Sequence, residues 1–354
     1  MKIIDRYLGI TAIRGTMLVL LMLMGLSVFI SLVKEIGDIG TGDYGILAVL
    51  EYIALDLPQQ IYAFFPMACL LGTLLGLGAL ASNSELIILR ASGVSVGRII
   101  WIVIKATLLM LVVATLIGEG LGPMAQHTAE VHKALLTSSG QALKTNQGTW
   151  IRDGENFLYI HTIVDNKDLR GISRYQFDNQ HNLLNASYAA TGAYIHGHWI
   201  MQNVVESNIN STKVTITKMP QADWQLSLSP NLLRISVVDP EEMSLLQLNS
   251  YLSYLKKNNL NATNYLLSFW QRLLQPLATI IMVWLAIPFI FGPLRSSTMG
   301  LRVLLGATFG FCFITLNQFF GPLSTVYQFP PILAASCPLF LFALTAWILQ
   351  RRVR

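Results

Sequence analysis

The sequence predicts an α-helical integral membrane protein with six transmembrane helices and an all-β domain inserted between the third helix and the fourth. Hydrophobic residues make up 53% of the chain and charged residues only 12%, and the mean hydropathy is +0.53. Soluble globular proteins are more polar than this. Uncharged runs long enough to cross a hydrocarbon layer occur on both sides of one polar block, at about residues 121–260, which is rich in β-forming residues.

The first three spans precede the polar block. Gly15 to Val33 and Leu57 to Ser84 are uncharged runs, and a third span extends from about Ile99 to Gly118, with Lys105 close enough to one end to reach the interface. Arg14 stands at the start of the first run, as in a signal peptide. Because the run is too long and no small-residue cleavage site follows at the usual distance, we expect a retained helix.

Three further spans follow the polar block. Leu273 to Leu294 forms the fourth span, and the stretch from Val303 to Gln350 has no charged residue and is too long for a single helix. Gly321-Pro322 and Phe329-Pro330-Pro331 mark the expected turn between spans five and six.

Basic residues indicate how the spans are oriented. The N-terminus, the connectors after spans two and four and the C-terminus hold eleven Lys or Arg and only two acidic residues, Asp5 and Glu85. The loop after span one holds Lys34 together with five acidic residues. The positive-inside rule therefore predicts that both termini are cytoplasmic and that the polar block lies outside. The net charge of +5 reflects this topology, and because the basic residues are scattered we expect no nucleic-acid partner.

The connector between spans two and three carries a short helix with its own start and stop signals. Ser82 and Glu85 have the spacing of a capping box, and Gly93 can supply the left-handed residue that ends a helix. We assign this helix to residues 84–92, where side chains at helical spacing could fill a groove on a partner. An ordinary interfacial helix between two spans fits equally well. The candidate partner-binding residues are Glu85, Leu86, Leu89, Arg90, Ala91, Ser92 and Gly93.

The polar block contains short segments rich in β-branched and aromatic residues. Turn residues at Asp153-Gly154, Asp178-Asn179 and His196-Gly197 separate them, which predicts a sandwich, jelly roll or open barrel. The expected strands are Thr149–Val164, Ser173–Phe177, Ala186–Ile195, His198–Val205, Lys213–Thr217 and Asp223–Leu228. The block's eleven basic residues balance eleven acidic ones, so it is no electrostatic arm for an anionic partner.

An amphipathic helix follows the expected strands. Asp239 is its expected cap, Pro240 lies in its first turn, and Lys256-Lys257 closes it. We expect its apolar face to pack on the β domain or on the membrane surface rather than to form a ligand site. The resulting units are residues 1–120 with spans one to three and the short helix at 84–92, residues 121–238 with the β domain, residues 239–260 with the amphipathic helix, and residues 261–354 with spans four to six.

Motifs for catalysis are absent from the sequence. It has no Walker A loop, no H-E-x-x-H, no G-x-S-x-G and no dinucleotide fingerprint. His196 and His198 fit a solvated turn better than a metal site, and all three cysteines fall inside spans, so no disulfide or zinc motif is expected. No carboxylate or histidine lies near the middle of a span, which argues against a proton-coupled carrier; Asn317 and Gln318 in span five fit polar contacts between helices.

These observations favour the membrane half of an ATP-driven transporter whose ATPase is a separate subunit. The alternative is a non-transporting membrane scaffold or sensor whose β domain binds a protein partner. A membrane-embedded lipid-modifying enzyme would need a reactive group of residues that the sequence does not contain.

Motifs along almost the whole chain support the first interpretation. In chain order they are Ile4-Asp5-Arg6-Tyr7-Leu8, Phe65-Pro66-Met67-Ala68, Leu70-Leu71-Gly72, Ser84-Glu85-Leu86, Ala91-Ser92-Gly93, Gly118-Glu119, Tyr188-Ala189-Ala190-Thr191, Phe291-Gly292-Pro293-Leu294-Arg295-Ser296, Met299-Gly300 and Phe320-Gly321-Pro322-Leu323. In this order and spacing the chain resembles the LptF/LptG family of lipopolysaccharide-export permeases, and most closely the LptG type.

The resemblance implies a multi-pass protein of the bacterial inner membrane, with a jelly-roll-like β domain in the periplasm. It also implies a heterodimer with an LptF-like permease around a cavity for lipopolysaccharide, an LptB-like ATPase dimer, an LptC-like single-span protein and a periplasmic bridge protein that receives the lipid on its way to the outer membrane. ATP and magnesium would be used by the ATPase, so no cofactor or metal is expected on this chain. The short helix, with Glu85, would couple the ATPase to the spans.

The resemblance also suggests where the lipid binds. Basic residues near the outer end of span one and after span three would meet its phosphates, which points to Lys34 and Lys133, and we add Arg272 as a further candidate for a charge-assisted contact. Each could equally be a solvated charge. The acidic residues Glu35 and Asp38 depart from the basic pattern expected here. Candidate acyl-chain residues, which could instead face the bilayer or the partner, are Met22, Leu26, Phe29, Ile30, Phe313, Leu316 and Phe320.

Overall fold

The computed structural model describes residues 2–137, 148–165, 168–178, 182–195, 198–209, 213–224, 226, 239–258, 260–291 and 298–353. The helices are α1 Lys2–Glu35, η1 Ile36–Asp38, α2 Ile46–Ser82, α3 Glu85–Ala91, α4 Val96–Leu116, η2 Ile117–Leu121, α5 Gly122–Thr137, α7 Leu245–Lys257, α8 Thr263–Phe291, α9 Met299–Val326 and α10 Pro331–Val353. The strands are β1 Thr149–Asp153, β2 Asn156–Asp165, β3 Asp168–Phe177, β4 Leu183–Ile195, β5 His198–Ile209 and β6 Val214–Trp224.

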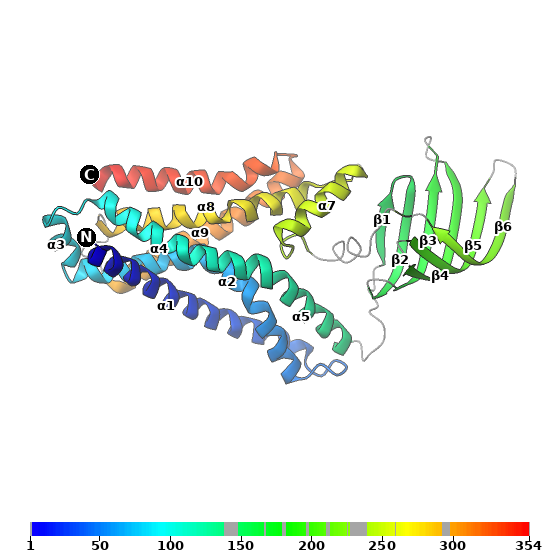
Figure 1. Cartoon of the computed structure of the whole chain (residues 1–354), viewed down its shortest axis with the longest axis horizontal. Helices are drawn as coiled ribbons and strands as arrows, with labels where there is room; N and C mark the ends of the chain where they lie inside the picture. The colour runs from blue at the N-terminus through cyan, green and yellow to red at the C-terminus, as the bar shows by residue number, and fades with distance from the viewer. Residues whose placement is uncertain are drawn as a thin grey trace.

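The fold class is confirmed. Within the described residues six helices are long and apolar enough to cross a membrane, and the β domain is inserted between the third and the fourth. Figure 1 shows the helices as a bundle with α3 and both termini at one end and the β domain beyond the other. We call these the α3 end and the β-domain end.

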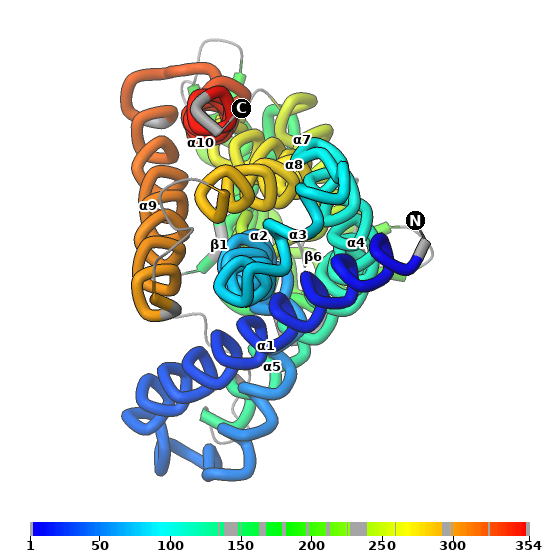
Figure 2. The backbone as a smooth tube through the Cα atoms, turned by 90° about the vertical axis from the view of Figure 1, so that its left-hand side faces the viewer, coloured from blue at the N-terminus to red at the C-terminus, as the bar shows by residue number. Residues whose placement is uncertain are grey.

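The spans differ in how deeply they are buried. In the most apolar stretch of α2 and of α8, 67% and 61% are buried, against 22% for α1 and 17% for α9. Figure 2 shows α2 and α8 in the middle, with α1 and α9 on different sides of α2. Because α1 and α9 expose most of their surface in the single chain, their side chains are available to contact lipid or a partner subunit.

Two helix ends differ from the sequence-based expectation. Span three does not stop near Gly118; it continues through the π-helical turn η2 into α5, so residues 122–137, assigned to the β domain, are helical. Gly118 allows the close approach of η2 to α2, since an added Cβ would lie 2.3 Å from the Tyr62 ring.

The prediction that Gly321-Pro322 marks the turn between spans five and six was wrong. Both residues lie inside α9, and the turn comes at residues 327–330. A proline inside a membrane helix is tolerated because neighbouring helices can satisfy the backbone groups that it leaves unpaired.

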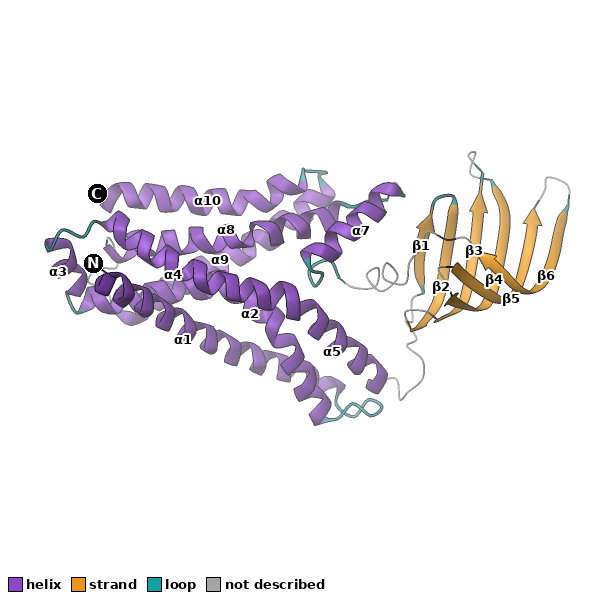
Figure 3. Ribbon diagram, viewed as in Figure 1, coloured by secondary structure: helices purple, strands orange, loops and turns teal. Residues whose placement is uncertain are grey.

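In its described residues the β domain is one antiparallel sheet of six strands in chain order (Figure 3). The first expected strand is in fact the hairpin β1–β2, which turns at Gly154, whose φ is +63°. The core residues Leu158, Ile172, Trp199 and Met201 are fully buried. The described residues do not include the expected turn residues Asn179, His196 and Gly197, the end of the sixth expected strand or the motif residues 292–296.

The amphipathic helix α7 starts later than expected. Asp239 to Glu242 form a turn, and the helix begins at Leu245 with Ser244 and Gln247 in a capping box. Its apolar face shares a core with the β strands, as predicted. Two hydrogen bonds join it to the β1–β2 hairpin: Tyr254 Oη donates to the Arg152 carbonyl at 2.7 Å, and the Gly154 N–H donates to Asn258 Oδ1 at 2.8 Å. This helix therefore connects the β domain to the bundle.

Candidate functional site

The first candidate site is α3, a two-turn helix between two spans. It ends as the sequence predicts: Gly93 has a φ of +91°, its N–H donates to the Arg90 carbonyl, and the Val94 N–H donates to the Leu89 carbonyl, which together form a Schellman motif. The predicted range of residues 84–92 agrees with α3 and its flanking residues Ser84 and Ser92, but the predicted capping residue was wrong. Ser82 is the last residue of α2 and its hydroxyl donates to the Gly78 carbonyl, so it caps nothing in α3.

The residues of α3 divide into a buried and an exposed set. Leu86 is only 2% exposed and Leu89 packs against the bundle core, so these two anchor the helix. Ile87 and Ile88 are 42% and 65% exposed. The predicted residues Arg90, Ala91, Ser92 and Gly93 are exposed as well. The surface open to a partner therefore includes them together with the two isoleucines, which are not among the residues predicted from the sequence. Four consecutive apolar residues must occupy more than one face of a helix, and that signal was present in the sequence.

Polar contacts tie α3 and its flanks to other spans. Tyr7 Oη in α1 donates to Glu85 Oε2 at 2.7 Å, and Arg98 at the start of α4 pairs with Asp5 at 3.2 Å. The Arg90 guanidinium lies 5.8 Å from the centre of the Phe291 ring in α8. These contacts join α3 to α1 and α8, and they join α4 to α1.

The three basic candidates lie at the β-domain end, in different environments. Lys34 is exposed. Lys133 in α5 bonds to the carboxylates of Glu35 and Asp38, each at 2.8 Å, and lies 5.1 Å from the centre of the Tyr52 ring. Lys133 thus holds α5 against the end of α1.

Arg272 in α8 is almost completely buried. Its Nε donates to Glu119 of η2 at 2.5 Å, one terminal nitrogen donates to the Met243 carbonyl, and the other donates to Gln59 Oε1 at 3.1 Å. Glu119 also accepts from the Leu245 N–H at 2.8 Å, which fixes the start of α7. This pair joins α2, η2, α7 and α8.

The acyl-chain candidates do not form a common surface within one chain. Met22, Leu26, Phe29 and Ile30 are exposed on α1. On α9, Phe313 is buried against Phe342, with ring centres 5.3 Å apart, and Leu316 and Phe320 pack on the bundle. The exposed aromatic residues of α9 are Phe311 and Phe319.

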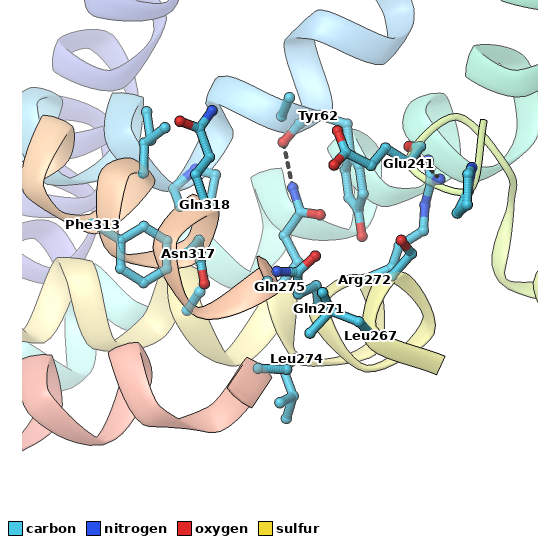
Figure 4. Close-up of a pocket in the computed structure, with 18 of the residues that line it drawn as sticks. Tyr62, Glu241, Leu267, Gln271, Arg272, Leu274, Gln275, Phe313, Asn317 and Gln318 are labelled. Atoms are coloured by element: carbon cyan, nitrogen blue, oxygen red, sulfur yellow. Dashed lines mark hydrogen bonds between the residues drawn. The ribbon is translucent and has the colours of Figure 1, made fainter. Parts of the chain in front are cut away.

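A cavity of about 870 Å³ lies in the β-domain half of the bundle, between α2, α8, α9, α10 and the turn before α7. Figure 4 shows Asn317 and Gln318 of α9 across from Gln271 and Gln275 of α8. We call it the amide pocket, because its lining includes six amide side chains: Gln59, Asn264, Gln271, Gln275, Asn317 and Gln318.

The acidic turn before α7 forms the most polar wall of the amide pocket. Asp239, Glu241 and Glu242 all line it. Burial and the nearby carboxylate of Glu130 raise the pKa of Glu242 to about 8. Arg272, also in the lining, has its charge balanced by Glu119. The described part of the pocket wall therefore carries no surplus of positive charge.

Six membrane-length helices, an inserted β domain and a short helix presented at the opposite end define a multi-pass membrane protein with an extramembrane domain. Its sequence matches the family described as lipopolysaccharide export system permease LptF/LptG over residues 6–352. The chain belongs to this family, and the resemblance seen in its motifs is confirmed.

Individual relatives agree with the family match. The chain is 38% identical to the lipopolysaccharide export system permease protein LptG of Escherichia coli strain K12, over 99% of this chain and 98% of the relative. It is 35% identical to LptG of Haemophilus influenzae, over 99% of each. Its similarity to LptF of Escherichia coli strain K12 is 26% identity over 48% of this chain and 47% of the relative. The family's two subunit types are thus related, and this chain is more similar to LptG.

Proposed function

We propose that this protein is the LptG-type permease subunit of an ATP-binding-cassette transporter that extracts lipopolysaccharide from the inner membrane and passes it to a periplasmic bridge protein. Family membership supports the substrate and the permease role. The observation that carries the mechanism is α3, a helix anchored by Leu86 that offers Ile87 and Ile88 to a partner. ATP would be hydrolysed by a separate LptB-like subunit, because the sequence contains no nucleotide-binding motif.

The geometry suggests how movement would reach the lipid. By the positive-inside rule the α3 end faces the cytoplasm and the β domain the periplasm. An ATPase closing on Ile87 and Ile88 would move α3, and the bond between Tyr7 and Glu85 would pass this movement to α1. The exposed helices α1 and α9 are the surfaces on which an LptF-like subunit and an LptC-like helix fit.

The lipid would lie between the two permease subunits. The exposed α1 residues Met22, Leu26 and Phe29 suit acyl chains, whereas Phe313 would contribute only from within the bundle. Lys34 is free to meet a phosphate at the outer end of α1. Lys133 and Arg272 would have to exchange their carboxylate partners for phosphate.

Reconstitution with a separate ATPase subunit tests the proposal. The purified chain should show no ATPase activity alone, and the assembled complex should show activity that depends on α3. Ile88→Ser should lower coupled turnover without impairing membrane insertion, and Glu85→Ala should do the same. The matched control is Ile46→Ser, an exposed isoleucine at the start of α2 near the β-domain end. Full coupled turnover in both α3 variants would contradict the role of α3.

A scaffold or sensor role predicts a different result. Photo-crosslinking from position 34 in intact membranes should label lipopolysaccharide if the chain transports it, and should label only proteins if the chain is a scaffold. The exposed position 105, near the middle of α4, serves as the control.

A further inference from the structure

The amide pocket contains polar groups that the protein leaves without partners. Gln275 donates to the Tyr62 carbonyl at 2.7 Å, and Gln59 accepts from Arg272. Over the described ranges, none of the other four amides, Asn264, Gln271, Asn317 and Gln318, makes a hydrogen bond to another residue. Asn264 and Gln318 are exposed, and Gln271 and Asn317 are half-buried. All four amides line the pocket and can therefore exchange hydrogen bonds with a polar ligand in it.

The remaining lining suits an amphiphile. Leu267, Leu274 and Phe313 contribute apolar parts of the pocket wall. In Figure 4 Phe313 lies on the side of Asn317, and Leu267 and Leu274 lie on the side of Gln271. Pockets that bind small ligands commonly combine such walls with a few converging polar groups, and a volume of about 870 Å³ is within their usual range. A sugar-sized polar group with part of an attached chain therefore fits.

The charge of the lining selects among polar ligands. Among the described lining residues the one cation is Arg272, which is held by Glu119 at 2.5 Å. Asp239 and Glu241 add negative charge at the polar wall. A phosphate would meet these carboxylates without a free cation to offset them, whereas hydroxyl and amide groups can donate to the carboxylates and exchange hydrogen bonds with the amides.

We propose that the amide pocket binds the uncharged, hydroxyl- and amide-bearing part of a glycolipid, and that its phosphates are held elsewhere. The proposal rests on the transport function above, which supplies the glycolipid. The pocket then acts as a second contact on the lipid, within one subunit and separate from Lys34. The pocket would recognise the uncharged part of the glycolipid by hydrogen bonding, and Lys34 would recognise its phosphates by charge.

Two photoreactive amphiphiles with the same chain test this selectivity. Dodecyl maltoside and dodecyl phosphate, each with a diazirine in the alkyl chain, are added to the full-length protein in phosphatidylcholine nanodiscs, and labelled peptides are identified by mass spectrometry. The maltoside should label residues 264–278 and 313–322, and unlabelled maltoside should compete saturably. The phosphate should label these peptides less.

Variants of the amide side chains test whether their hydrogen bonds cause the maltoside labelling. Gln271→Leu with Asn317→Leu should lower maltoside labelling about three- to tenfold, the effect of losing one or two hydrogen bonds. Thr315→Val, an exposed residue of α9 outside the pocket, should leave it unchanged. Gln271→Lys should raise dodecyl phosphate labelling, a gain that requires a folded pocket.

Three outcomes would overturn the proposal: equal labelling by the two amphiphiles, labelling unaffected by the amide variants, or amide variants that instead lose the LptF-like subunit, which would make these amides contacts between helices. The transport function is judged separately. Lipopolysaccharide crosslinked at position 34 with an unlabelled pocket rejects only the pocket, and a labelled pocket with no lipopolysaccharide crosslinked at position 34 counts against the transport role alone.

Discussion

The two ends of the helix bundle are held together by polar contacts in contrasting environments. At the α3 end the Tyr7–Glu85 and Arg98–Asp5 contacts lie near the surface. At the β-domain end Arg272 is buried and pairs with the partly buried Glu119, and the two also bond to groups of α2 and α7. Surface contacts are weak and exchange readily with water, whereas a buried charge that loses its partner is costly. The α3 end is therefore expected to change conformation more easily than the β-domain end.

Breaking the buried pair should have the largest effect. Glu119→Gln leaves the Arg272 charge without its counter-ion and should lower the free energy of unfolding by about 3–5 kcal/mol, measured by denaturation in mixed micelles. Replacing both partners, with Glu119→Leu and Arg272→Met, should recover much of this loss. A small effect of Glu119→Gln would show that the two ends do not differ in this way.

Removing the anchor of α3 should come next. Leu86→Ala deletes a side chain that is 2% exposed, and should cost about 2–3 kcal/mol. Coupled ATPase turnover should fall as well, because α3 loses the packing contact that holds it against the bundle. Ile88→Ala on the exposed face is the matched control, and its stability should stay within about 0.5 kcal/mol of the parent.

The acidic turn predicts a pH dependence at the β-domain end. Since the folded protein raises the pKa of Glu242 from 4.5 to about 8, it binds this proton more tightly than the unfolded chain does. The free energy of unfolding should therefore fall as the pH rises from about 5 to about 8. Glu242→Gln keeps a neutral side chain at every pH and should flatten the profile over this window; an unchanged slope would reject the assignment to Glu242.

The smallest change in stability is expected at the α3 end. Tyr7→Phe removes only the hydroxyl that donates to Glu85, so the fold should persist while ATP hydrolysis becomes less tightly linked to lipid release. The measurement is the ratio of lipid released to ATP hydrolysed in reconstituted vesicles. Tyr327→Phe, at a strongly exposed tyrosine, is the control. An unaltered ratio would mean that the contact does not transmit movement.

The sequence predicts most of the fold because its signals are local. Uncharged runs located the six spans, and Gly93 placed the end of α3. Local signals failed where neighbouring structure decides: Pro322 was read as a break, yet it lies inside α9. The start of α7 was misplaced for a similar reason, because Asp239 and Ser244 both resemble helix caps and only the structure shows which one caps.

The sequence by itself determined which segments cross a membrane, where the β domain is inserted and that α3 exists, because hydropathy, strand propensity and capping residues act over a few positions. The tertiary structure alone decided which residues of α3 are exposed, that Arg272 is bound to Glu119, 153 residues away, and that amides from α8 and α9 meet in one pocket. These depend on packing between segments far apart in the chain, which no local pattern encodes.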